Sequence, residues 1–226
     1  MELVAFAGEI VGLAGLAGQG QSEMLRALFD AARRRKAGAE IDGSAALVAG
    51  DRQTDGIFPL WSIALNISIG SLRALTRLGL VDAGAEAALA HGWRERIGIR
   101  TPDIDDNILT LSGGNQQKAL FARALGSAAE IVLMDDPMRG VDVGTKREVY
   151  AMIRAEAEAG RTFVWYTTEM DELQHRQREG RKRVAKDAAG EDRRPHAGSW
   201  NEACSTASSV AMARGRSATI RPSRKT

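Results

Sequence analysis

Three short, mostly apolar runs stand out along the chain, and each is followed by small, acidic or hydroxyl-bearing residues. The runs are Ile10–Ala14, Ile131–Met134 and Thr162–Tyr166. None of them alternates between polar and apolar positions, which is typical of strands covered on both faces in a parallel sheet. We therefore predict three buried parallel strands with a ligand site at their carboxyl ends.

Helical periodicity fills the stretches between these runs. The predicted helices span Ser22–Ala32, Asn115–Leu125 and Lys146–Glu158, and residues 60–110 are mostly helical, most clearly at Ala83–Arg96. Ser112 stands at a capping position before the second helix, and Gln116 lies near its third helical position. Strands that alternate with helices predict an α/β domain with a mainly parallel sheet.

The apolar pattern ends after Leu173, and the charge changes sign at the same place. The formal net charge of +2 divides into residues 1–173, with 18 Lys and Arg against 24 Asp and Glu, and residues 174–226, with 13 against 5. The second part has too few apolar residues to build a core. We predict a domain over 1–173, with a helical part over about 60–126, and a basic, disordered tail over 174–226.

Composition excludes several classes of protein. No apolar run approaches the roughly 18 to 20 residues that a membrane-spanning helix needs, and Met1–Val4 lacks the basic start of a secretory signal. Because Cys204 is the single cysteine, it forms no internal disulfide, which favours a reducing compartment. His91, His175 and His196 lack the spacing of zinc ligands or of a catalytic dyad.

A glycine-rich segment follows the first predicted strand. Residues 15–22, Gly-Leu-Ala-Gly-Gln-Gly-Gln-Ser, match the phosphate-loop pattern G-x-x-x-x-G-K-[ST], except that Gln21 replaces the lysine. The glycines let backbone N–H groups converge on an anion, and Ser22 is placed to ligate magnesium. A neutral glutamine lacks a charge-assisted phosphate contact worth roughly 1.5 to 3 kcal/mol. A plain tight turn is the alternative interpretation.

A serine and two glycines open another predicted helix. Ser112, Gly113 and Gly114 indicate a second anion site of the helix-terminus type. The strand that follows ends in two carboxylates, of which Asp135 can hold magnesium and Asp136 can polarise an attacking water. Each piece alone could be a capped helix or an acidic strand end, but their order and spacing favour a nucleotide site.

Together these segments resemble the ATP-binding cassette family. The matching residues are the glycine loop, Leu111–Gln117, Met134–Pro137 and Arg139–Gly144, and the resemblance covers about residues 8–173. Gly50–Arg52, Trp61–Ile69 and Trp165–Glu169 are similar, more narrowly, to the C-terminal cassette of tandem-cassette ATPases that power sugar import of the ribose and galactose type. The resemblance implies a P-loop cassette fold with a parallel sheet core and a helical signature subdomain.

In that family ATP lies between two cassettes, so each chain contributes to two sites. The resemblance implies that Asp136 occupies the position of the water-polarising glutamate. It implies that the following residues contact phosphate or magnesium in the chain's own site: Gly15, Gly18, Gly20, Gln21, Ser22 and Asp135. It implies that a second group reaches the γ-phosphate held by the partner: Ser112, Gly113, Gly114 and Gln116. ATP and Mg²⁺ are the expected cofactors.

Four positions depart from the family pattern. Gln21 replaces the lysine, Asp136 the catalytic glutamate and Thr168 the switch histidine, and Gly50–Arg52 occupies the glutamine-loop region. A shorter carboxylate and a hydroxyl in place of an imidazole weaken positioning, and each ~1.4 kcal/mol lost from the transition state is tenfold in rate. We expect a degenerate site that binds ATP-Mg and hydrolyses it poorly, beside an intact signature that completes the partner's hydrolytic site.

The resemblance also implies missing pieces. The upstream aromatic residue that stacks on adenine is absent, because the chain starts 14 residues before Gly15. The antiparallel portion expected between residues 35 and 49 is short, with Ile41–Gly43 and Ala46–Val48 to represent it. After the last predicted strand the arginine-rich tail replaces a further strand, which suggests a change of reading frame or a recently altered terminus.

We therefore expect the ATPase subunit of a sugar-import transporter, with low intrinsic activity, peripheral on the cytoplasmic side of the cell membrane. The expected partners are a second cassette, membrane permease subunits and, indirectly, a substrate-binding protein. Two alternatives stay open: a truncated or frameshifted, non-functional remnant, and a soluble nucleic-acid-associated cassette protein. Trp200 is the sole aromatic residue of the basic tail, which disfavours nucleic acid as a partner.

Overall fold

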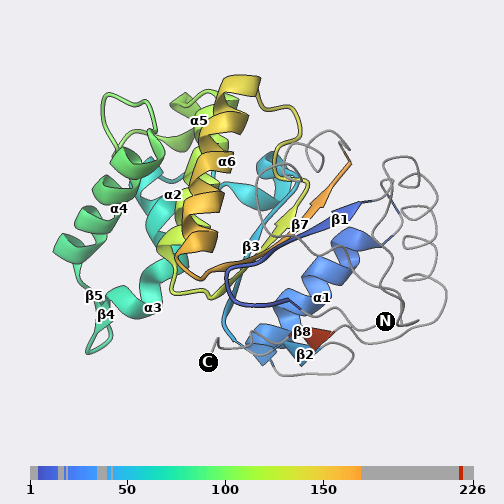
Figure 1. Cartoon of the computed structure of the whole chain (residues 1–226). Coiled ribbons are helices and arrows are strands. Elements are labelled where there is room, and N and C mark those ends of the chain that lie inside the picture. The colour runs from blue at the N-terminus through green and yellow to red at the C-terminus, as the bar shows by residue number, and fades with distance from the viewer. Residues whose placement is uncertain are drawn as a thin grey trace, which may run out of the picture.

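A parallel sheet of four strands, in the order β1-β7-β6-β3, forms the centre of the molecule (Figure 1). The structure is a computed structural model that describes residues 5–14, 18, 20–34, 40–41, 43–168 and 219–220. The strands of this sheet are β1 (Ile10–Ala14), β3 (Ala45–Val48), β6 (Ile131–Asp135) and β7 (Thr162–Thr167). The three strands predicted from the apolar runs are thus confirmed, and β3 is an addition.

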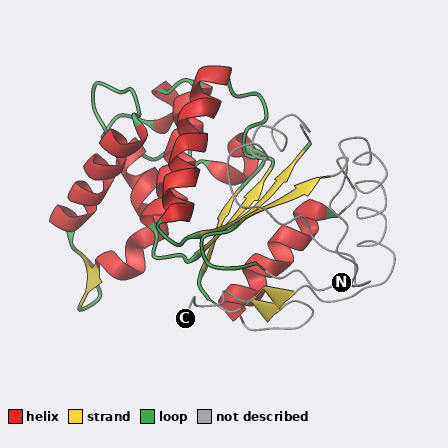
Figure 2. Cartoon of the chain, in the orientation of Figure 1, coloured by secondary structure: helices red, strands yellow, loops and turns green. Residues whose placement is uncertain are grey.

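Both faces of the sheet are covered, which explains why its strands lack polar alternation. Along β6, Ile131 and Leu133 pack with α1 (Gln21–Arg34) on one face, and Val132 and Met134 pack on the other. The second face is covered by α5 (Gly113–Gly126) and α6 (Val143–Glu158), as Figure 2 shows. The result is a three-layer α/β arrangement, as the alternation of elements predicted.

A largely helical part lies beyond α5 and α6, on the left in Figure 1. It contains α2 (Ile63–Ser68), α3 (Leu72–Leu75), α4 (Ala83–Ile97), the 3₁₀ turns η2 (Ile69–Ser71) and η3 (Ile108–Thr110), and a hairpin of β4 (Thr76–Arg77) and β5 (Leu80–Val81). Side chains cap its helices: Ser62 accepts from the Leu65 N–H, and Asp82 accepts from the Ala85 N–H. The predicted helix over Ala83–Arg96 is confirmed.

The expectation that Ala46–Val48 belongs to an antiparallel portion is wrong. β3 pairs in parallel with β6, from Ala45 against Ile131 to Val48 against Met134. The physical reason is burial on both faces, since Val48 joins the core beneath α5 while Leu47 packs toward α1. The short run that seemed too small for an antiparallel sheet is therefore the fourth strand of the parallel one.

Two residues of the predicted tail are described. Thr219 and Ile220 form β8, which pairs in parallel with β2 (Glu40–Ile41). The other residues of 174–226 lie outside the described residues, so the predicted division at 173 and the predicted disorder stay predictions. Within the described residues, no helix is long and apolar enough to cross a membrane.

Candidate nucleotide site

The carboxyl ends of three strands meet at one edge of the sheet. β1 pairs with β7 so that Ala14 lies opposite Thr167, and β6 pairs with β7 so that Asp135 lies opposite Tyr166. The loop to α1, the two carboxylates and the threonines after β7 therefore come together, as in other open parallel sheets. The juxtaposition predicted from the three separate runs is present.

The glycine loop is described in part, because Gly15 lies outside the described residues. Gly18 and Gly20 have backbone φ angles of 83° and 90°, in the left-handed region that favours glycine. Among the described residues, a Cβ atom at Gly18 would have no neighbour within 4 Å, so the backbone conformation is what favours glycine there. Gln21 is the first residue of α1 and Ser22 the second.

Ser22 and Asp135 form the direct link between the glycine loop and β6. The Ser22 Oγ donates to Asp135 Oδ1 at 2.7 Å, and Asp135 is buried. A hydroxyl and a carboxylate oxygen at this spacing are the hard ligands that Mg²⁺ prefers. No group of three or more His, Cys, Asp or Glu residues able to hold a metal occurs among the described residues. Because Mg²⁺ is octahedral, phosphate and water oxygens would complete its shell.

Asp136 is held by the threonines at the end of β7. Its Oδ2 accepts from the Thr168 Oγ at 2.8 Å, and its Oδ1 accepts from the Thr167 Oγ and the Thr168 N–H, both at 3.4 Å. The residue has a positive φ of 42° and is 7% exposed. Backbone strain in a buried, polar position is a feature of functional sites. The carboxylate therefore faces the end of β7 through hydrogen bonds to both of its oxygens.

Tyr166 is a buried phenol that the sequence pattern did not single out. Its side chain is 4% exposed, and its hydroxyl has no hydrogen-bond partner among the described residues. Burial raises the pKa of the Tyr166 phenol, and the carboxylates of Asp136, Asp135 and Glu23 raise it further. Three carboxylates therefore lie near the Tyr166 hydroxyl, while the charge of Arg139 acts in the opposite direction.

The predicted second anion site begins α5. Ser112 is the N-cap, and its Oγ accepts from the Asn115 side-chain amide at 3.1 Å and from the Asn115 N–H at 3.4 Å. A Cβ at Gly113 would lie 2.8 Å from the Arg52 guanidinium, and a Cβ at Gly114 would lie 2.9 Å from the Thr145 hydroxyl. A larger residue at Gly113 or Gly114 would therefore have to displace the side chain of Arg52 or Thr145.

Gln116 lies deeper than the other residues of this group. It is 5% exposed, and its amide donates to the Leu111 carbonyl at 3.2 Å and to the Ile108 carbonyl at 3.4 Å. Its Oε1 accepts from the Gln53 amide at 3.4 Å. In this structure Gln116 joins the start of α5 to η3 and to the turn around Gln53, and its contact with a partner's phosphate stays a prediction.

Comparison with known proteins agrees with this geometry. A model of the ABC transporter family matches residues 1–139, which include the glycine loop, the capped start of α5 and both carboxylates. The chain belongs to the ABC transporter family. Members of the family are ATPases, and the predicted cassette fold and resemblance are thereby confirmed.

Curated relatives of this cassette are named as sugar importers. The chain is 39% identical to the ribose import ATP-binding protein of Rhizobium johnstonii over 182 residues, and 39% identical to the arabinose import ATP-binding protein of Burkholderia ambifaria over 190 residues. The alignments cover 74% and 76% of this chain and 36% and 37% of the relatives. The cassette thus spans little more than a third of the length of the relatives it matches.

Solved structures share the cassette fold. An ATP-binding cassette solved as a dimer in a post-hydrolysis state with ADP and Pi has a TM-score of 0.59 at 23% identity, covering 73% of this chain and 77% of that one. A bacterial Atm1-family ABC exporter with ATP bound has a TM-score of 0.55 at 22% identity, covering 74% of this chain and 30% of that one. At these identities the likeness shows the fold alone.

A single turn of π-helix, η1 (Arg52–Gly56), lies between the strand ends and α5. It follows Gly50, where a Cβ would lie 2.7 Å from the Asp135 carbonyl oxygen, and it ends beside α5. Asp51 caps the turn, and the hydrogen bond from the Thr54 hydroxyl is the main cause that lowers the pKa of the Asp51 carboxyl below 3.8. Sequence reasoning missed this turn, although the spacing of Asp51 and Thr54 is a capping signal.

Arg123 of α5 fixes the end of the same turn. Its guanidinium donates to the Gly56 carbonyl at 2.6 Å and to the Asn66 carbonyl at 2.6 Å, and it lies 5.1 Å from the centre of the Phe58 ring. Burial lowers the pKa of Arg123 to about 10, so the side chain is charged at neutral pH. Arg123 thereby links the end of η1 to the last turn of α5 and to Asn66 of α2.

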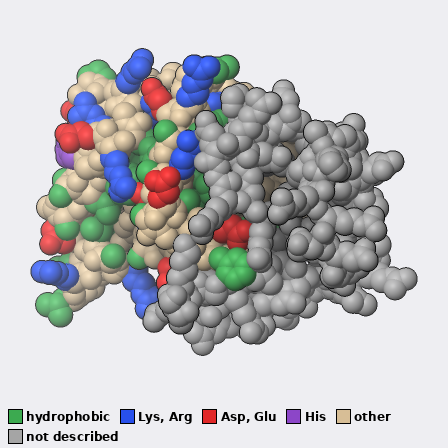
Figure 3. Space-filling model, in the orientation of Figure 1, with side chains coloured by type: hydrophobic (Ala, Val, Ile, Leu, Met, Phe, Trp, Pro, Cys, Tyr) green, Lys and Arg blue, Asp and Glu red, His purple; other side chains and the backbone are tan. Residues whose placement is uncertain are grey.

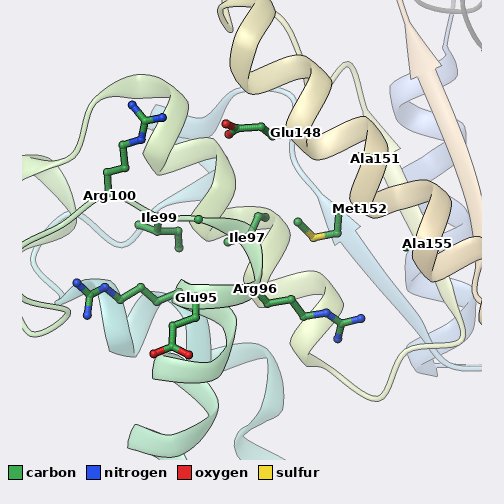
Figure 4. A pocket seen from close by; sticks show the side chains of 11 residues that line it. Glu95, Arg96, Ile97, Ile99, Arg100, Glu148, Ala151, Met152 and Ala155 are labelled. Atoms are coloured by element: carbon green, nitrogen blue, oxygen red, sulfur yellow. The ribbon is translucent and has the colours of Figure 1, made fainter.

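A pocket of about 870 Å³ lies elsewhere, between the end of α4 and α6 (Figure 4). Ile97 and Met152 face one another across it, and none of its lining residues belongs to the strand ends. Two of the charged residues that line it form ion pairs, since Glu148 bonds Lys118 and Arg96 bonds the buried Glu156. We interpret this pocket as a gap between packed helices, apart from the nucleotide site.

Proposed function

We propose that this chain is an ATP-binding, energy-coupling cassette of a sugar-import ABC transporter. The observation that carries the proposal is that one chain holds a Ser22–Asp135 pair at the strand ends, 2.7 Å apart, and a separate, correctly capped signature helix. The names of the ribose and arabinose import relatives supply the substrate class. The particular sugar is left open by the residues described.

In its own site the cassette binds ATP with Mg²⁺. Gly15, Gly18 and Gly20 cradle the phosphates, Gln21 donates a neutral hydrogen bond to them, and Ser22 and Asp135 ligate the metal. When bound, Mg²⁺ neutralises charge on the phosphate oxygens. The carboxylate-rich strand ends support this assignment, because a phosphate would be repelled there unless a cation lay between them.

That site hydrolyses ATP poorly. Asp136 stands where the family has the water-polarising glutamate, and the Thr168 hydroxyl, at the switch-histidine position, donates to it at 2.8 Å. A carboxylate whose oxygens already accept three hydrogen bonds within the chain is a weaker partner for an attacking water. Gln21 adds no charge to stabilise the transition state. These three departures act in the same direction.

The signature helix completes the competent site of a partner cassette. Ser112 fixes the first turn of α5, and the N–H groups of Gly113 and Gly114, at the first two positions, have no acceptor inside the helix. These N–H groups can therefore donate to the γ-phosphate of an ATP held by the partner, and Gln116 lies in the next turn of the helix. The partner is a second cassette, in the same protein or another.

Membrane permease subunits dock on an exposed apolar patch formed by Phe58, Leu60, Trp61, Leu65 and Leu109. Phe58 and Trp61 stack with their centres 4.6 Å apart, and the Ile108 N–H donates to the Trp61 carbonyl, which brings Leu109 beside them. These side chains are 37% to 91% exposed. Apolar residues gathered on a surface mark an interaction site. The cassette is then peripheral on the cytoplasmic side, and a substrate-binding protein acts through the permease.

The first test is nucleotide binding by the purified full-length chain. We expect millimolar MgATP to raise the thermal unfolding midpoint by a few degrees, because a ligand that binds only the folded state stabilises it. Turnover of ATP by the chain alone should stay near background and rise when a cassette with intact lysine and glutamate is added. Robust turnover by the chain alone would contradict the division of roles. Absence of any cooperative, MgATP-shifted transition would favour a non-functional remnant.

A further inference from the structure

The β4–β5 hairpin projects from the helical part without contributing to either core. Thr76 pairs with Val81 and Arg77 pairs with Leu80, so the connection is the two-residue loop Leu78-Gly79. Each residue from 76 to 81 is exposed, and none belongs to the clusters of buried side chains. An isolated two-stranded hairpin is marginally stable in water. Packing therefore does not explain the residues at its tip.

Leu78 is unfavourable at that tip for two independent reasons. Leu78 and Gly79 have φ angles of 51° and 84°, the two left-handed conformations of a type I′ turn, where Asn-Gly is preferred. Leucine is a poor residue for the left-handed region. The Leu78 side chain is also fully exposed to water. Because neither the turn conformation nor exposure to water favours leucine at position 78, its side chain indicates contact with another surface.

The chemistry around the tip is apolar at its end and basic at its base. Leu80 is 76% exposed and Val81 is 44% exposed, while Arg77 and Arg73 are exposed basic residues next to them. Residues 72–81 contain no Asp or Glu. At the lower left of Figure 3 an apolar corner lies beside basic side chains, where Figure 1 places this hairpin.

We propose that this hairpin contacts an anionic lipid bilayer directly. Leu78 and Leu80 insert at the boundary between headgroups and acyl chains, and the guanidinium groups of Arg73 and Arg77 meet lipid phosphates. Arg77 lies opposite Leu80 in the hairpin, so its apolar stem follows the leucine while its charge stays at the headgroups. A convex tip with a basic base matches such a surface. The contact needs no nucleotide, so it goes beyond the proposed function.

A local probe tests insertion apart from other sources of membrane binding. The segment 174–226 has 13 basic against 5 acidic residues and could attract anionic vesicles by itself. Binding of the whole chain to vesicles is therefore not a test of insertion by the hairpin. Because Cys204 is the single cysteine, Cys204→Ser with Leu78→Cys accepts one environment-sensitive fluorophore. A label at Val143→Cys, an exposed apolar residue at the start of α6, is the control.

We expect protein-free vesicles of phosphatidylcholine with about one-third phosphatidylglycerol to blue-shift the label at 78, while the label at 143 changes little. Bromine-labelled acyl chains should quench the label at 78. Vesicles of phosphatidylcholine alone should give a several-fold weaker effect. An unchanged emission at 78 in anionic vesicles overturns the proposal, and so does a shift that requires vesicles containing a membrane protein, since the tip would then fit a protein partner.

A second variant excludes misfolding as the cause of lost binding. Leu78→Asn creates the Asn-Gly pair that a type I′ turn prefers, so the thermal midpoint should not fall. Removal of one inserted leucine should weaken partition to the anionic vesicles about tenfold. Equal partition of Leu78→Asn and the parent chain would also overturn the proposal. Neither experiment contains ATP, so failure of the nucleotide site leaves both results interpretable.

Discussion

The two helix starts of this cassette have different charged neighbours. At the start of α1 the Ser22 hydroxyl donates to the Asp135 carboxylate. The start of α5 has the guanidinium of Arg52 against Gly113. Both are helix N-termini, with the same backbone donors and the same direction of dipole. What differs is the charge that the rest of the fold brings to each.

In the proposed function, α1 contacts the phosphates of the chain's own ATP and α5 contacts those of an ATP held by a partner, so the difference bears on how each start binds phosphate. In the proposed site, a phosphate near the carboxylates would need a bridging cation, so we expect ATP binding there to depend on Mg²⁺. At α5 the positive surroundings suit a bare phosphate oxygen, and the cap keeps the first turn formed without a ligand. Asp142, the N-cap of α6, lies on the other side beside Gly114 and limits the positive charge there. The comparison yields four predictions.

The largest effect is expected at the signature helix. Ser112→Asp keeps a good N-cap, so α5 should remain formed, but it places a negative charge where a partner's γ-phosphate is expected. Because like charges brought together at an interface cost several kcal/mol, we expect ATP turnover of the mixed cassettes to fall about 100-fold or more. Ser112→Asn is the matched control, an equally good and neutral cap, and it should lose far less.

Binding of MgATP to the chain's own site separates this effect from a general defect. Ser112→Asp should leave that affinity unchanged, because the two helix starts belong to different sites. If turnover of the mixture is the same for the aspartate and asparagine variants, the signature helix of this chain does not contact the partner's phosphate, and the comparison between the two helix starts loses its functional meaning.

The next effect concerns the strand ends. Asp135→Asn removes a metal ligand and a negative charge, so we expect the affinity for ATP to fall about tenfold with Mg²⁺ present and to rise slightly in EDTA, where repulsion of the phosphates is relieved. Isothermal titration with and without Mg²⁺ measures both. Ser22→Ala should show the loss without the rise. A fall of equal size in EDTA would mean that Asp135 acts on the fold and not on a metal.

Sequence pattern was sufficient for the elements whose signal is local. The apolar runs of β6 and β7 and the cap before α5 are each written in a few consecutive residues, and the structure has them. The sequence pattern failed to predict the direction in which β3 pairs, because a four-residue run is too short to show whether its neighbour is parallel. That direction is set by pairing with β6, 86 residues further along the chain. Spacing marked Gly113 and Gly114 as an anion site, but it gave no sign that the side chains of Arg52 and Thr145 lie against them.

Tertiary contacts also supplied what no spacing could. The hydrogen bonds of Asp136 come from threonines 31 and 32 residues away, and the buried state of Gln116 depends on η3 and on Gln53. The residues of the candidate site could be chosen from motifs. Which of their atoms already have partners is a property of the folded chain, and it bears directly on the turnover expected from each site.

A third prediction restores the missing groups at the strand ends. Gln21→Lys with Thr168→His supplies a cation for the phosphates and removes the threonine hydroxyl from Asp136. We expect intrinsic ATP turnover to rise about tenfold, because a charge-assisted hydrogen bond contributes at least roughly 1.5 kcal/mol and about 1.4 kcal/mol corresponds to a tenfold change in rate. Gln21→Lys alone should mainly raise affinity. Since Asp136 remains one methylene shorter than glutamate, full activity is not expected, and no rise in turnover would place the limitation at Asp136.

The smallest effect concerns the turn that joins the two regions. The Thr54 hydroxyl bond is the main cause that lowers the pKa of Asp51 in the folded state, so the stabilisation from this cap is present above pH 3.8 and is lost as pH falls through the lower, folded value. Thr54→Val removes the hydroxyl donor and should move the pKa of Asp51 upward, toward 3.8. Titration of the Asp51 carboxyl by NMR measures the shift, and Thr54→Ser, which keeps the hydroxyl, is the control. If the valine variant instead leaves this pKa unchanged, the backbone N–H groups of Gln53 and Thr54 alone hold the charge, and the turn between Asp135 and α5 is fixed by its backbone and by Arg123.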